Sequence, residues 1–204
     1  DHQFSFTTRG SLDNASSSML VLHYTFDNNT LDHSDADGSF QDASVIGTEN
    51  YAKGKNNDNF GAYQFQDNDY LNVSSVSLNS NPFSVCLWAL PESFEESRMD
   101  LLNTGNSGLK LGYKENGNKI FFNENNVPTN NQYGQKEWSH LCVTYDGSNK
   151  LELYANGEAL KNVQESITLG TFSLQIGASF DGSNNWNGRI DDFKLFDRKL
   201  EGDE

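Results

Sequence analysis

The chain has 204 residues and carries 14 Lys and Arg residues against 29 Asp and Glu residues, a formal net charge of −15 at pH 7. Binding to nucleic acid depends on basic side chains that displace counterions from phosphates, so this charge excludes nucleic acid as a main partner. No apolar run reaches the roughly 18 residues that a membrane-spanning helix needs, which excludes membrane insertion by a helix. With 35% apolar and 12% aromatic residues, the chain can still fill a sizeable core.

A short polar arm precedes one long domain. Residues 1–18 lack the apolar centre of a signal peptide, so we expect any such peptide to have been removed already. No linker-like block interrupts residues 20–200. We therefore predict a polar N-terminal arm over residues 1–18 and a single domain over residues 19–204.

The domain has the sequence pattern of an all-β protein. Runs rich in β-branched and aromatic residues lie between clusters of Gly, Asn, Asp and Ser. In the first run Leu20, Leu22 and Tyr24 would share one face of a half-buried strand. The plainest runs are residues 20–26, 83–89, 109–113, 119–122, 138–145, 151–155, 172–176 and 189–196. With Asn-Gly and Asp-Gly pairs favouring hairpin turns between several of them, the sequence predicts a two-sheet antiparallel β-sandwich.

Two cysteines lie at the centres of predicted strands. Cys86 should share a face with Trp88, and Cys142 lies within residues 138–145. Two buried free thiols would pack there as small hydrophobes. A disulfide is the favoured interpretation, because a cross-link that closes a loop of this length stabilises a domain by about 4 kcal/mol in the chain-entropy model. A disulfide, together with three Asn-X-Ser/Thr sequons, favours an extracellular location.

Common catalytic motifs are absent from the sequence. It contains no His-Glu-x-x-His, no Gly-x-Ser-x-Gly, no phosphate-binding glycine loop and no Cys/His zinc spacing. A β-sandwich glycosidase needs two carboxylates that project to the same side. The densest carboxylate cluster, residues 92–96, follows Pro91 where a loop is expected, and we interpret it as a solvated acidic loop. We predict that the protein is not an enzyme, with a glycosidase or lyase as the competing hypothesis.

Two acidic segments have the composition of calcium sites. Residues 27–38 are crowded with Asp and Asn, and Asp191-Asp192 opens the last predicted strand. Calcium prefers several oxygen ligands from carboxylates, amides and backbone carbonyls. A carboxylate beside core residues is costly to bury unpaired, so Asp191 should meet a cation or several donors. A solvated acidic turn is the alternative for both segments.

Five segments, in chain order, resemble laminin-G-like domains of the concanavalin A-like lectin/glucanase superfamily. The closing strand, which begins at Gly188 and leads to Leu200, is one of them. The five segments are residues 24–34, 83–88, 138–147, 153–158 and 188–200. The resemblance implies a jelly roll whose first and last strands lie side by side.

The cysteine positions resemble those of pentraxins, which implies a Cys86–Cys142 disulfide. Pentraxins hold calcium in two loops that face the ligand, and by position Asn106 and Asp181 fall in the corresponding loops here. They are therefore candidate ligand-binding residues. The residues beside Asp181 lack the acidic and amide ligands of that family, so a phosphocholine site of the pentraxin type is not expected.

The wider family resemblance implies a structural calcium ion. In many relatives the Asp that opens the closing strand helps to bind calcium near the N-terminal strand. The equivalent residue here is Asp191, and the expected contributors from the N-terminal segment are Asp27 and Asp32. Such a site would tie the two ends of the domain together.

Aromatic residues supply the remaining candidates for ligand binding. Trp88 and Trp138 lie in strand patterns and are expected in the core. Trp186 lies in an amide-rich loop, where an exposed ring would form a stacking platform for a sugar; burial against the sheet is the alternative. Tyr133 and Tyr113 are further candidates.

Laminin-G-like domains bind sugars, proteins or lipids, and the fold alone does not say which. We expect a non-enzymatic adhesion or recognition module, extracellular or at the cell surface, that binds glycans and holds a structural calcium ion. The alternative is a structural or protein–protein interaction module excised from a larger cell-surface or appendage protein.

Overall fold

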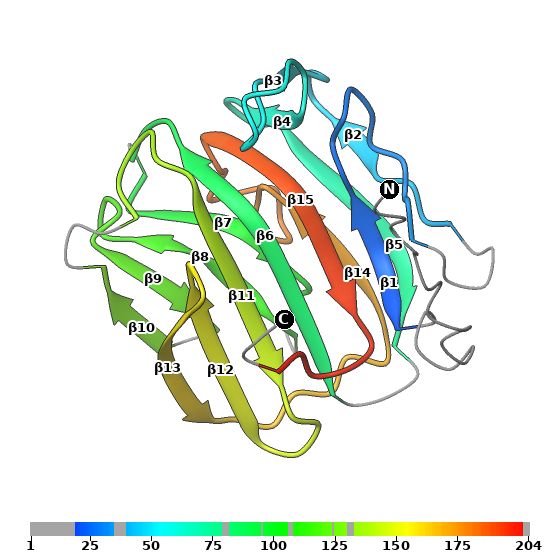
Figure 1. Cartoon of the computed structure of the whole chain (residues 1–204), viewed down its shortest axis with the longest axis vertical. Coiled ribbons are helices and arrows are strands. Elements are labelled where there is room, and N and C mark those ends of the chain that lie inside the picture. Colours follow the sequence, from blue (N-terminus) through cyan, green and yellow to red (C-terminus); the bar gives the residue numbers. More distant parts are fainter. Residues whose placement is uncertain are drawn as a thin grey trace, which may run out of the picture.

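The computed structural model describes residues 19–34, 40–78, 82–94, 96–105, 108–123, 125–129 and 133–201. Across these residues fifteen strands form two antiparallel sheets, and no helix is present. The predicted all-β sandwich is therefore confirmed (Figure 1). The arm of residues 1–18 lies outside the described residues. No helix in the described ranges is long and apolar enough to cross a membrane.

The first sheet contains the first and last strands of the domain. Its order is β13-β12-β11-β6-β15-β4-β3, with β1 paired to β15 beside β4. Its strands are β1 (Leu20–Tyr24), β3 (Tyr51–Ala52), β4 (Ala62–Phe65), β6 (Phe83–Pro91), β11 (Ser139–Tyr145), β12 (Lys150–Ala155), β13 (Glu158–Gln164) and β15 (Gly188–Phe196).

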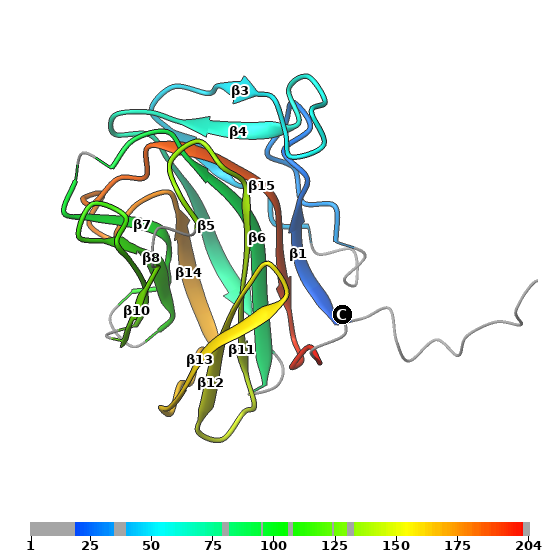
Figure 2. The ribbon, with the colours of Figure 1, turned by 60° about the vertical axis from the view of Figure 1, so that its left-hand side comes forward.

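The second sheet packs against the first as a separate layer (Figure 2). Its strand order is β10-β9-β8-β7-β14-β5-β2. Its strands are β2 (Ser44–Ile46), β5 (Tyr70–Ser77), β7 (Arg98–Asn103), β8 (Lys110–Lys114), β9 (Lys119–Phe122), β10 (Asn125–Pro128) and β14 (Thr171–Ile176). Side chains from the inner faces of both sheets form one continuous core.

Strand β15 changes neighbours halfway along its length. Gly188 to Ile190 pair with β4, whereas Phe193 to Phe196 pair with β1. A register shift between Asp191 and Lys194 marks the change, and Asp192 has a φ of 50°. The bulge lets one strand serve two partners, and the predicted adjacency of the first and last strands is confirmed.

The disulfide joins the centres of two neighbouring strands. Cys86 of β6 and Cys142 of β11 are directly paired residues, and their sulfur atoms are bonded. The implied Cys86–Cys142 bridge is thus confirmed, and it closes a separation of 56 residues. Both cysteines face away from the core, on the surface that we call the outer face of the first sheet.

Strand alternation decides which β6 side chains enter the core. Val85 and Leu87 point inward, so Cys86 and Trp88 share the outer face, as predicted. The prediction that Trp88 is a core residue is wrong, because its ring is only half-buried there. The ring lies 5.1 Å from that of His140. Trp138 is also half-buried and precedes β11 rather than lying inside it.

Candidate functional site

Three loops meet at one end of the sandwich and enclose a polar hollow. They are the β4–β5, β6–β7 and β14–β15 connections. The hollow has a volume of about 230 Å³, and we call it the loop-end hollow. Its lining residues are Asp67, Asn68, Glu96, Met99, Asn185 and Asn187.

Backbone hydrogen bonds fix the longest of these loops, residues 177–187. The N–H of Glu92 donates to the carbonyl of Asn187 at 3.0 Å, and the N–H of Asp100 donates to that of Asn184 at 2.9 Å. The loop is thereby tied to the end of β6 and to β7. The amide side chains of Asn185 and Asn187 consequently have a defined position at the rim.

A buried carboxylate anchors the same loop from below. Asp100 of β7 has no exposed surface, and Arg98 binds both of its oxygens, at 2.6 and 2.9 Å. The Ser179 hydroxyl and the Asn103 amide each donate to Asp100 Oδ2, at 2.8 and 2.9 Å. A buried charge with this many donors stabilises one arrangement of the loop, because any other leaves the charge without partners.

Trp186 lies beneath the loop-end hollow and not at its surface. The side chain is fully buried in the core and stacks on the ring of Tyr113, with 5.6 Å between centroids. The prediction of an exposed stacking platform at Trp186 is therefore wrong, and the alternative, burial against the sheet, is confirmed. Burial of the large apolar indole between the sheets is favourable because it removes apolar surface from water. This gain in free energy decides the orientation of Trp186, although its neighbours in the sequence are polar. Its Nε1 has no hydrogen-bond partner.

Two other predicted ligand residues, Tyr133 and Asp181, do not line the hollow either. Tyr133 is 8% exposed and packs in the core, so it presents no binding surface. Asp181 is exposed, but its carboxylate accepts the hydroxyl and the backbone N–H of Ser183, which lower its pKa. Asn106 lies outside the described residues. Thus neither Trp186, Tyr133 nor Asp181 lines the loop-end hollow.

The lining of the hollow includes a hydrogen-bond donor without a partner and two carboxylates that can accept hydrogen bonds. Asn185 Nδ2 is buried and has no partner. The carboxylates of Asp67 and Glu96 are exposed at the same rim. Amides and carboxylates together donate to and accept from hydroxyl groups. The amide-rich run around Trp186 pointed to this loop, whereas nothing in the sequence singled out Asp67 or Asn68.

Asp32, one of the predicted calcium ligands, is buried, and its carboxylate accepts hydrogen bonds from backbone N–H groups. Its Oδ1 accepts the N–H groups of His23 at 3.0 Å and Ser34 at 2.9 Å, and its Oδ2 accepts that of Gln41 at 3.1 Å. The side chain is 5% exposed and closes the loop that follows β1. Asp32 was predicted as a calcium ligand, and the partners that the structure gives it are backbone amides.

Asp191, another of the predicted calcium ligands, faces a different loop. Its Oδ2 accepts the backbone N–H of Lys55 at 2.9 Å, and burial nevertheless raises the pKa of Asp191 to about 6. Burial also opposes ionisation of the adjacent Asp192. Hydrogen bonds from His23, Lys194 and Lys55 outweigh that effect and hold the pKa of Asp192 well below its usual range.

The structure does not bring Asp27, Asp32 and Asp191 together as a metal site. Within the described ranges no group of three or more His, Cys, Asp or Glu side chains could hold an ion. Asp27 is exposed, both oxygens of Asp32 accept backbone N–H groups, and Oδ2 of Asp191 accepts another. These residues do not fit a shared calcium ion.

Asp35 and Asp37 of the acidic segment 27–38 lie outside the described residues, so calcium binding by that segment stays a prediction. Melting curves with calcium and with a chelator test it. A higher melting midpoint with calcium is expected, and identical midpoints would overturn it.

Comparison with solved structures finds the same fold at low sequence identity. Domain 4 of the extracellular GH43 arabinanase AbnA from Geobacillus stearothermophilus, in complex with arabinotriose, has a TM-score of 0.72 at 19% identity, covering 92% of this chain and 96% of that one. The binding domain of botulinum neurotoxin DC, in complex with rat synaptotagmin II, has a TM-score of 0.67 at 16% identity.

A structure of botulinum neurotoxin type C, whose cell entry depends on interaction with two ganglioside molecules, gives the same TM-score and identity. In both toxin comparisons the match covers 92% of this chain and 50% of the toxin chain, so this chain spans about half of their length. At such identities the likeness shows the fold alone.

The family itself follows from the sequence. No curated protein sequence matches the chain. A laminin G family model, described as the concanavalin A-like lectin/glucanases superfamily, matches residues 65–204. This match includes eleven of the strands above, β5 to β15, together with the disulfide and all three loops of the hollow. The chain therefore belongs to the concanavalin A-like lectin/glucanase superfamily, as a laminin-G-like domain.

Proposed function

We propose that this protein is a non-enzymatic extracellular recognition module that binds a glycan in the loop-end hollow. The observation that carries the proposal is the buried, unpartnered Asn185 Nδ2 in a hollow that Asp67 and Glu96 also line. A sugar hydroxyl can accept from the amide and donate to a carboxylate. Such pairing would meet the donor that the protein leaves without a partner.

Similar folds support a carbohydrate as the ligand. The arabinanase domain was solved with arabinotriose, and the type C neurotoxin interacts with gangliosides. The hollow of about 230 Å³ is small and polar, which suits a single sugar ring better than a large apolar ligand.

The carboxylates of the hollow support binding rather than glycoside hydrolysis. A glycosidase needs one carboxylic acid kept protonated near neutral pH, usually by burial. Asp67 and Glu96 are both exposed, so neither is desolvated in this way. An extracellular location is supported by the disulfide, since such bonds persist in oxidising compartments.

A glycan array tests the proposal. The wild-type protein should bind a defined set of glycans, and Asn185→Ala should weaken that binding about tenfold or more, because it removes a donor that the protein leaves without a partner. Asn126→Ala is the matched control, since Asn126 is an exposed Asn on β10. A blank array would overturn glycan binding. Turnover of any glucan substrate would overturn the non-enzymatic assignment.

A second candidate function, protein recognition, is favoured by exposed apolar side chains near the start of the domain. Phe40 is 61% exposed, Phe60 57% and Leu31 50%. The loops that carry Leu31 and Phe60 are joined where the N–H of Asn28 donates to the carbonyl of Phe60 at 2.9 Å. A neurotoxin binding domain of the same fold was solved with a protein receptor. A Phe60→Ser variant that retains glycan binding but loses a cell-surface protein in a pull-down would support this candidate; retention of that protein would count against it.

A further inference from the structure

A second hollow lies on the outer face of the first sheet, over the disulfide. It has a volume of about 360 Å³, within the usual size range of small-molecule sites. Cys86 and Cys142 line it, together with residues from β12, β15 and the segment that follows β15. We call it the disulfide hollow. It shares no lining residue with the loop-end hollow.

Strand register sets the floor of this hollow. Lys194, Cys86, Cys142 and Tyr154 are consecutive partners across β15, β6, β11 and β12, so their side chains form one row on the outer face. Two residues further along these strands, Phe196, Ser84 and Thr144 form the next row. The floor therefore belongs to the most extensively paired part of the molecule and cannot shift without breaking the sheet.

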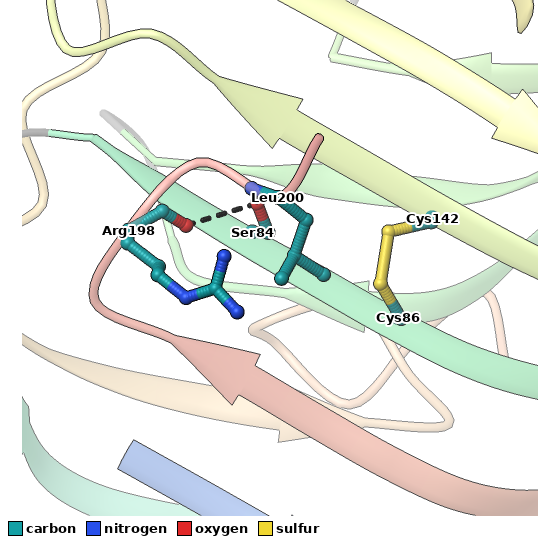
Figure 3. Close-up of a disulfide and its surroundings, with 5 residues drawn as sticks. All are labelled: Ser84, Cys86, Cys142, Arg198 and Leu200. Carbon is teal, nitrogen blue, oxygen red and sulfur yellow. Dashed lines mark hydrogen bonds between the residues drawn. A yellow bond between two sulfur atoms is a disulfide. The ribbon is translucent and has the colours of Figure 1, made fainter. Parts of the chain in front are cut away.

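The segment after β15 forms a fixed wall. The buried Ser84 hydroxyl donates to the carbonyl of Arg198 at 3.0 Å and accepts the N–H of Leu200 at 2.8 Å (Figure 3). This pair of hydrogen bonds holds residues 198–200 beside the disulfide, where Arg198 and Leu200 line the hollow. The wall is thus a built feature and not a chance approach of a loop.

An unmet polar group lies in the same hollow. Thr144 is 2% exposed, and its Oγ1 is buried without a hydrogen-bond partner. Leaving a buried hydroxyl unpaired costs stability, because the group has lost its contact with water. Thr144 therefore adds an unpaired hydroxyl to the lining of the hollow, an observation that does not depend on the shape of the hollow.

The charge at the hollow contrasts with that of the whole chain. The chain has a net charge of −15, yet Lys194 and Arg198 both line this hollow, with Glu201 as its one acidic lining residue. Lys194 Nζ lies 3.0 Å from Asp192 Oδ2 and still presents part of its surface. Burial and the nearby Lys55 and Lys194 lower the pKa of His140, so this lining residue does not add a charge near neutral pH. The two cations come from β15 and from the segment that follows it, beside a floor that is otherwise largely apolar.

We propose that the disulfide hollow binds a small amphiphile with one anionic group, of which a medium-chain fatty acid is the simplest example. The apolar body would lie on the disulfide and on Tyr154, Phe196 and Leu200. The anionic head would face Lys194 and Arg198, since charge-assisted hydrogen bonds to cations recognise a carboxylate selectively. The site is separate from the glycan site, and either can exist without the other.

Calorimetric titration with sodium decanoate, below its micelle concentration, tests the proposal, with decanol as the uncharged probe of equal length. We expect saturable binding of decanoate and at least about tenfold weaker binding of decanol. Lys194→Gln should weaken decanoate binding by a similar factor, because Asp192 keeps its contacts with His23 and Lys55 and the fold is retained. Lys119→Gln is the matched control, since Lys119 forms an exposed ion pair with Glu115 on the other sheet.

Equal affinity for decanoate and decanol, or no effect of Lys194→Gln, would overturn recognition of the anionic group. Amide chemical shifts give a second measurement that does not depend on a variant. Decanoate should shift the signals of Cys86, Thr144 and Leu200 and leave that of Asn185 unchanged. No saturable shift at these three residues would overturn the site.

Discussion

The two hollows of this domain are held in place by different means. The disulfide hollow lies on the outer face of a sheet, where pairing between strands fixes each side chain. The loop-end hollow is formed by three loops, which a few buried groups such as Asp100 hold in place. Damage to the sheet should therefore lower the stability of the whole domain, whereas damage beneath the loops should alter one binding site most.

Removal of the disulfide should produce the largest effect on stability. The Cys86→Ala/Cys142→Ala double variant should lose about 4 kcal/mol of unfolding free energy in the chain-entropy model, because the bond closes a separation of 56 residues. Urea unfolding measures this loss. Glycan binding below the melting transition should persist, and its complete loss in a folded double variant would contradict the separation of the two regions.

Asp100→Asn should have the next largest effect and should act on the loops. The amide cannot accept all the donors that now meet the carboxylate, so we expect a loss of about 3 kcal/mol. Glycan affinity should fall while decanoate affinity stays unchanged. The control is Asp181→Asn, an exposed residue of the same loop, which should change stability by less than about 0.5 kcal/mol. Equal losses in both variants would refute the anchoring role.

Asp191→Asn tests the pH response at the bulge of β15. Because burial raises its pKa to about 6, folded Asp191 retains a proton that the unfolded chain has already released. Wild-type stability should therefore fall as pH rises from about 4 to about 6, by roughly 2 kcal/mol from this group. The Asn side chain does not titrate, so the free energy of unfolding of the variant should not show this fall. Measured in chelator, the variant should therefore become more stable relative to the wild type as the pH rises across that range. Parallel profiles would contradict it.

Trp186→Phe should have the smallest effect of the four. Replacing a fully buried indole by a smaller ring leaves a cavity, for which we expect a loss of about 1 to 2 kcal/mol. Trp88→Phe, on the half-buried outer face, should cost less than about 0.5 kcal/mol. Thermal unfolding of both variants measures the contrast. A greater cost at Trp88 would show that the outer face carries more of the packing energy than its burial indicates.

The plainest predicted runs all overlap strands of the structure, whereas several other strands, including the alternating β5, were not among those runs. The runs around Leu20, Phe83 and Trp138 have a clear apolar face, and each corresponds to a strand. Strand β3 has two residues, and β13 is a polar edge strand with no buried residue, so neither has an apolar pattern to detect. The disulfide could be inferred because alternation and the family resemblance agreed on both cysteines.

The site was less predictable than the fold. Composition marked Trp186 and Asp191 as unusual, but only tertiary packing decides whether a loop side chain turns outward or into the core. Asp67 and Glu96 are separated by two strands in sequence and meet only because their loops leave the sandwich at the same end. The proximity of such residues depends on the topology of the fold, which cannot be predicted from the residue pattern of a single segment.

The pairing of β1 with β15 has a consequence for engineering. Leu20 and Phe196 are direct partners in an antiparallel ladder, so the polypeptide enters and leaves the sandwich at neighbouring points. A short connector would suffice for circular permutation, and a surface loop of a host protein could accept the whole sandwich as an insertion with little change in its own span.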